Sequence, residues 1–171
     1  MELFGSRTRA FSLAAVVCGV LSAAATAYAL AAGDRAPEIG LDDLAGNHVT
    51  VTALRGQVLV VAFWGSWCVP CESEMRALER LYVELRARGL ATVGVSEDTT
   101  DHNVENFLRR IPVSFPIVRD ADHTVARRYA LGPMTTFIFD RSGGLRHIHP
   151  GFRAQDAAVI ETELRALLAE R

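Results

Sequence analysis

Two cysteines three positions apart are the residues of this sequence whose type and spacing could do chemistry. Cys68 and Cys71 enclose Val69 and Pro70 and follow Trp67. A disulfide that only stabilises a fold usually joins distant parts of a chain and gains from closing a long loop. Because this pair is too close in sequence for that, we expect a redox-active dithiol that exchanges with disulfides of other molecules.

The cysteine pair lies between a predicted strand and a predicted helix. Residues 58–64 are a continuous apolar run, which is typical of a strand buried on both faces. From Glu72 onward, apolar residues recur at helical spacing until Gly89. The unpaired N–H groups and the positive dipole end at a helix start stabilise a thiolate. We therefore predict that Cys68 attacks a partner's disulfide and that Cys71, about one turn later, resolves the mixed disulfide.

The rest of the chain predicts one α/β domain over residues 33–171. Strands alternate with helices and are followed by a final hairpin and helix, a pattern that indicates a mixed sheet. Strands or extended segments are expected at 38–44, 48–52, 90–96, 115–118, 135–140 and 145–149. Helices are expected from Glu72 to the arginines Arg86 and Arg88, and at 101–110, 121–130 and 154–170.

Residues 1–32 differ in composition from the rest. A short basic start precedes a stretch from Phe11 to Ala32 that has no charged residue and ends in small residues. This is the build of a secretory signal peptide, although an uncleaved stretch of this length could also serve as a weak, alanine-rich membrane anchor. Both alternatives predict a periplasmic or other extracytoplasmic domain, in which Cys68 and Cys71 are the only cysteines. The net charge of −2 does not favour a nucleic-acid partner.

The segment around the cysteines resembles a known family. Its residues are Phe63-Trp64-Gly65-Ser66-Trp67-Cys68-Val69-Pro70-Cys71-Glu72-Ser73-Glu74-Met75, and they are similar to the active-site segment of the TlpA/ResA group of thioredoxin-like proteins. The resemblance extends over the whole exported part. It implies a thioredoxin-like fold, with a mixed central sheet flanked by helices and an N-terminal β-hairpin extension.

The resemblance also implies a role. Proteins of this group resemble periplasmic or membrane-anchored reductases that use no cofactor beyond the redox-active disulfide, here Cys68–Cys71. The clients that it implies are apocytochromes c and copper-assembly proteins, with a membrane-bound thiol reductase as electron donor. It further implies a proton partner. Thioredoxins carry a buried Asp where this chain has Ala62, and Glu74 matches the acidic residue that follows the cysteines in this group.

Glu74 has a second interpretation, as an acid in the first helical turn that only complements the helix dipole. As the functional residue, its charge near the sulfurs would make Cys68 less acidic, which suits a reductant.

A second implied feature is a cis-proline loop that faces the disulfide. Here the sequence reads Gly132-Pro133-Met134-Thr135, with the proline one position earlier than the family has it. We expect a cis bond before Pro133, although a trans bond before Met134 is the alternative. The residues expected to contact a client are Trp67, Pro70, Pro133, Met134 and Thr135.

Other functions remain open from the sequence alone. A thiol oxidase that introduces disulfides would use the same cysteines. A copper or haem chaperone could use them as soft ligands, with His147 or His149 contributing. A zinc site normally needs four ligands, and no second cysteine pair exists here, so no metal site is predicted.

Overall fold

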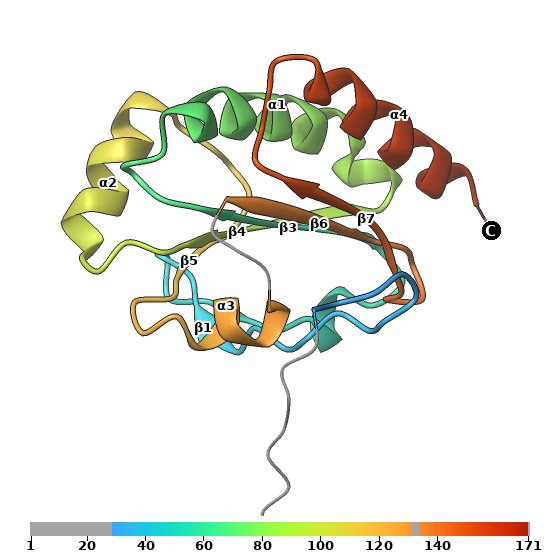
Figure 1. The fold of residues 1–171 in the computed structure, drawn as a ribbon, viewed down its shortest axis with the longest axis horizontal. Coiled ribbons are helices and arrows are strands. Elements are labelled where there is room, and N and C mark those ends of the chain that lie inside the picture. The colour runs from blue at the N-terminus through green and yellow to red at the C-terminus, as the bar shows by residue number, and fades with distance from the viewer. Residues whose placement is uncertain (1–28, 131–133, 171) are drawn as a thin grey trace, which may run out of the picture.

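The computed structural model describes residues 29–130 and 134–170 of the 171-residue chain. Figure 1 shows the arrangement of the elements. The strands are β1 (Leu41–Asp42), β2 (His48–Val49), β3 (Val58–Trp64), β4 (Leu90–Ser96), β5 (Ile117–Arg119), β6 (Thr135–Phe139) and β7 (Leu145–Pro150). The α-helices are α1 (Val69–Leu85), α2 (Asp101–Arg110), α3 (Thr124–Tyr129) and α4 (Asp156–Ala169), and the short 3-10 helices are η1 (Thr52–Leu54) and η2 (Arg86–Arg88).

The central sheet is mixed and has the strand order β5-β4-β3-β6-β7. β3 pairs in parallel with β4, and β4 in parallel with β5, whereas β6 is antiparallel to both β3 and β7. β1 and β2 form a separate antiparallel pair. The fold therefore confirms the predicted thioredoxin-like architecture with its N-terminal hairpin. The carboxyl ends of β3 and β4 lie at the same edge of the sheet, and the cysteine segment follows β3 there.

Two layers of side chains cover the sheet. In Figure 1, α1 and α4 lie over one face and α3 lies on the other. All of β3 is buried, and its residues alternate between the two core clusters. The even-numbered residues pack with α1, α2 and α4, and the odd-numbered ones with α3 and the N-terminal segment. Trp64, the last residue of β3, is 1% exposed, and its ring centroid lies 4.5 Å from that of Phe107. Trp64 therefore belongs to the core.

Most predicted elements are confirmed, but the N-terminal hairpin is shorter than expected. The strands predicted at 38–44 and 48–52 are reduced to the two residue pairs of β1 and β2. Gly40 has a φ of 62°, which interrupts the extended conformation before β1. After β2 the chain turns into η1. The hairpin therefore lies where the sequence predicts it, but it is shorter than predicted.

The first long helix also has different bounds. α1 begins at Val69 rather than near Glu72, because Cys68 caps it and Pro70 fits its first turn. Arg86 and Arg88 do not form its last turn but make up η2, which ends at Gly89 with a φ of 97°. No helix in the described part of the chain is long and apolar enough to cross a membrane. The segment 1–32, predicted to be a signal or anchor, lies almost wholly outside that part.

Candidate active site

Cys68 and Cys71 form a disulfide at the start of α1, with their Cα atoms 5.3 Å apart. Cys68 is the N-cap residue, and its Sγ accepts a hydrogen bond from the backbone N–H of Cys71 at 3.2 Å. Pro70 lies in the first turn, where no N–H is needed. The helix start therefore directs a donor at the sulfur of Cys68. After reduction, this arrangement stabilises negative charge on that sulfur.

The surface beside the disulfide is apolar and open. Cys68 and Cys71 are 3% and 1% exposed, whereas the neighbouring Trp67 and Val69 are 56% and 83% exposed. The indole of Trp67 lies against Gly65, where a Cβ atom would stand only 2.6 Å from the indole nitrogen. A client that approaches the disulfide would therefore meet an indole and an isopropyl group. That Trp67 contacts the client stays a prediction.

A buried carboxylate fixes the loop before the cysteines. Asp98 follows β4 and is buried. Its Oδ2 accepts hydrogen bonds from the N–H of Ser66 and the hydroxyl of Ser96, each at 2.9 Å, and its Oδ1 accepts from the hydroxyl of Ser66 at 2.7 Å. Because Ser66 lies two residues before Cys68, Asp98 joins the β3–α1 loop to the end of β4. Asp98 was not among the residues predicted for the site, although the carboxyl ends of adjacent parallel strands lie together and could have indicated it.

We expect Asp98→Ala to destabilise the oxidised protein by about 2–4 kcal/mol, because it leaves the N–H and hydroxyl of Ser66 without their acceptor. Asp98→Asn should retain most of the stability, since the Ser66 hydroxyl can rotate and accept from the new amide. Urea unfolding measures the stability of both variants, and insulin turnover measures their activity. If both variants lose the same free energy of unfolding, the hydrogen bonds from Ser66 do not explain the contribution of Asp98 to stability.

Glu74 is buried between α1 and β6, one helical turn after Cys71, and is 2% exposed. Its Oε1 accepts a hydrogen bond from the hydroxyl of Thr136 at 2.6 Å. Thr136 in turn pairs with Ala62 between β6 and β3. Ala62 is the position at which the resemblance to thioredoxins would place an Asp. It lies opposite Thr136, the residue that donates to Glu74. Sequence reasoning did not indicate Thr136, because no local pattern gives the β3–β6 register.

The environment of Glu74 favours its neutral form. Burial raises the pKa of Glu74 to about 7, against the hydrogen bond from Thr136, which lowers it, and the negative charge of Asp156 raises it further. The alternative that Glu74 is a first-turn acid is wrong, because the first turn of α1 contains Glu72 instead. A carboxyl that is half ionised near neutral pH can both take and return a proton.

The loop before β6 is described only from Met134 onward. Met134 has a left-handed φ of 62°, packs against the core, and accepts a hydrogen bond from the N–H of Gly151 at 2.7 Å. Thr135 is buried and pairs with Pro150. Pro133, with its expected cis bond, lies outside the described residues. The expected client contacts of Met134 and Thr135 stay predictions.

The two histidines of β7 have a partner on α4. Nδ1 of His147 lies 3.2 Å from Oε1 of Glu163, and Nε2 of His149 lies 2.7 Å from its Oε2. These contacts join β7 to α4. Within residues 29–130 and 134–170, no three His, Cys, Asp or Glu side chains are grouped so that they could hold a metal ion.

A thioredoxin-like sheet with a C-x-x-C disulfide at a helix N-terminus defines the class of thiol–disulfide exchange proteins. The model of the AhpC/TSA family matches residues 32–148, and the chain belongs to this family as a ResA-like thioredoxin-family oxidoreductase. Similar curated proteins bear the name thiol-disulfide oxidoreductase ResA. The one from Geobacillus thermodenitrificans is 38% identical over 124 residues, 72% of this chain and 71% of the relative. The one from Geobacillus kaustophilus is 36% identical over 140 residues, 81% and 79% of the two chains.

Solved structures agree with this assignment. A Chlorobium tepidum crystal structure, provisionally assigned as thiol:disulfide interchange protein DsbE, is 30% identical with a TM-score of 0.79 and covers 82% of this chain and 100% of its own. The thioredoxin domain of a thiol-disulfide oxidoreductase from Bacteroides vulgatus is 25% identical, with a TM-score of 0.70 and coverage of 80% and 99%. The chain is therefore a thioredoxin-like thiol–disulfide oxidoreductase that contains the Cys68–Cys71 pair.

Proposed function

We propose that the protein acts outside the cytoplasm as a reductant of client disulfides, without a cofactor beyond its own cysteine pair. The observation that carries this proposal is the buried Glu74, one turn from Cys71 and with a pKa raised by burial to about 7. A reductant needs a resolving thiol that can lose its proton near neutral pH. Glu74 supplies a carboxylate for that proton.

The reaction begins from the reduced pair. The Cys68 thiolate attacks one sulfur of the client disulfide, and the other client sulfur leaves as a thiolate. Cys71 then gives its proton to Glu74 and attacks the sulfur of Cys68, which releases the second client thiolate. Two electrons pass to the client, and the Cys68–Cys71 disulfide of the structure is formed.

The family resemblance supports the proposed donor and clients. A membrane-bound thiol reductase would restore the dithiol by the reverse exchange, giving two electrons to Cys68–Cys71. Apocytochromes c and copper-assembly proteins are the proposed clients, because the cysteines that attach haem or bind copper must be reduced before they can do so. The uncharged stretch from Phe11 to Ala32 supports export, and we propose that it is retained as an anchor.

Equilibration with glutathione tests the direction of electron flow. A reductant of this kind should have a potential in the range of thioredoxin, around −270 mV, whereas a disulfide-introducing oxidase would lie nearer −120 mV. The measurement needs only the purified chain, glutathione buffers of known ratio, and alkylation of free thiols. A potential near that of the oxidase would overturn the proposal and favour the alternative that the sequence left open.

A further inference from the structure

One end of the domain gathers arginines that have no carboxylate partner. It lies at the start of β3, at the opposite end of that strand from the disulfide. The segments that meet there are the residues before β1, the turn before β3, η2 and the β6–β7 turn. The arginines that they contribute are Arg35, Arg55, Arg86, Arg88 and Arg141, and none of them takes part in an ion pair with a described residue. We call these five residues the arginine end.

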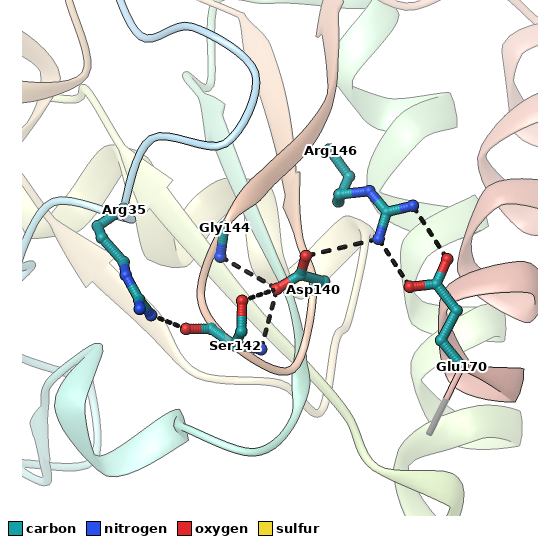
Figure 2. A network of polar contacts seen from close by, with 6 residues as sticks. All are labelled: Arg35, Asp140, Ser142, Gly144, Arg146 and Glu170. Atoms are coloured by element: carbon teal, nitrogen blue, oxygen red, sulfur yellow. Dashed lines mark hydrogen bonds and ion pairs between the residues drawn. The ribbon is translucent and has the colours of Figure 1, made fainter.

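Hydrogen bonds show that these segments form one surface. The guanidinium of Arg141 donates to the carbonyl oxygens of Gly56 at 2.9 Å and Arg88 at 3.1 Å. Arg35 donates to the carbonyl of Ser142, as Figure 2 shows. A hollow of ≈ 330 Å³ opens between Arg35, Arg55 and Arg141. A hollow lined by three arginines suits an oxygen-rich anion such as a phosphate.

The acidic groups nearby are occupied. Asp140 also lines the hollow, but its carboxylate accepts hydrogen bonds from Ser142 and Gly144 and faces Arg146, which also binds Glu170 (Figure 2). The acidic side chains that bond into these segments are Asp34, Glu38, Asp140 and Glu170. Together with Arg146, six arginines exceed these four acids. The end is therefore positive, although the whole chain has a net charge of −2.

The chain enters the domain at this same end. The N–H of Gly33 donates to the carbonyl of Leu145, and the N–H of Ala36 donates to the carbonyl of Gly143. The uncharged stretch of the sequence stops at Ala32, three residues before Arg35. Three residues span at most about 11 Å. If that stretch lies in a bilayer, Arg35 must lie at or close to the layer of lipid head groups.

We propose that the arginine end docks on the phosphate groups of anionic phospholipids. This inference rests on the proposed export and retained anchor. A weak apolar anchor gains stable membrane attachment from a second, basic signal. β3 has seven residues and spans roughly 23 Å, so docking holds Cys68 and Cys71 away from the bilayer and open to clients.

The test uses the full chain reconstituted in vesicles of phosphatidylcholine, with or without phosphatidylglycerol. Hydrogen–deuterium exchange is followed at residues 33–36, 55–57 and 141–144. Because the apolar segment can insert in both kinds of vesicle, a difference between them reports the docking of the domain. We expect slower exchange at all three segments with phosphatidylglycerol, and reversal of that protection by high salt.

Arg55 and Arg88 are the arginines to replace, because no described residue accepts a hydrogen bond from either side chain. Arg55→Gln combined with Arg88→Gln should weaken docking roughly 30-fold. The matched control is Arg109→Gln with Arg127→Gln, which removes two exposed arginines of α2 and α3 and should leave the protection unchanged.

Three results would overturn the proposal. They are equal exchange in the two kinds of vesicle, equal weakening by the control pair, and full protection by inorganic phosphate in vesicles of phosphatidylcholine alone. Insulin reduction is measured on the same samples and should be unaffected by either pair of substitutions. Protection without insulin reduction would contradict the proposed function and leave the docking intact.

Discussion

Cys68→Ser is expected to reduce insulin turnover to the uncatalysed background. The serine hydroxyl is not ionised near neutral pH and cannot attack a disulfide, whereas the sulfur of Cys68 accepts the N–H of Cys71 at the start of α1. Cys71→Ser should instead preserve the first attack and accumulate a mixed disulfide between Cys68 and the client. Turnover and non-reducing gel electrophoresis measure these two outcomes.

The matched control is Cys18→Ser, which makes the same substitution in the uncharged N-terminal stretch and should leave turnover unchanged. The trapped Cys71→Ser species, isolated from cells and analysed by mass spectrometry, names the client. If Cys68→Ser traps clients and Cys71→Ser does not, the roles of attacking and resolving cysteine are reversed. Recovery of apocytochromes c or copper-assembly proteins would support the proposed clients.

Glu74→Gln is expected to change how stability depends on pH. In the unfolded chain this carboxyl has an ordinary pKa near 4.5, and in the folded protein burial raises the pKa to about 7. Between these two values the folded state holds a proton that the unfolded chain has released. The free energy of unfolding of the native protein therefore falls as pH rises through that window, by about 3 kcal/mol in all.

Glutamine cannot ionise, but its carbonyl can still accept from Thr136. The stability of Glu74→Gln relative to the native protein should therefore grow between pH 4.5 and 7 and stay constant above. Urea unfolding of the oxidised protein at several pH values measures this difference. Glu72→Gln is the control on the same helix, because Glu72 is only partly buried and pairs with Arg110. Its difference should stay within about 1 kcal/mol. A flat profile for Glu74→Gln would show that the pKa of Glu74 is not raised in the folded protein.

The same substitution tests the proton transfer. In the native protein, resolution of the mixed disulfide should accelerate as Glu74 ionises through pH 7. Glu74→Gln should slow this step roughly 100-fold at pH 7, because general base catalysis is lost. The pH profile of Cys68 alkylation should also move to lower pH, since a nearby negative charge is removed. An unmoved alkylation profile would remove the functional role assigned to Glu74.

Short-range patterns were sufficient for most of the fold. The apolar run of β3, the helical spacing of α1 and the bounds of β4 and α2 follow from neighbours in sequence, because burial and helix capping are local. The length of the hairpin was overestimated, because residue types alone do not show that Gly40 takes a left-handed conformation that ends the extended segment.

The sequence alone determined the chemistry expected of Cys68 and Cys71. The spacing of this pair, its place between strand and helix, and its family resemblance all indicated disulfide exchange. The tertiary structure decided which groups surround that pair. It places the Glu74 side chain in the core, where it accepts a hydrogen bond from Thr136. It also places Asp98, which follows β4, within hydrogen-bond distance of Ser66, which follows the neighbouring parallel strand β3. These contacts join residues 62 and 32 positions apart, and only strand register and helix packing bring such residues together.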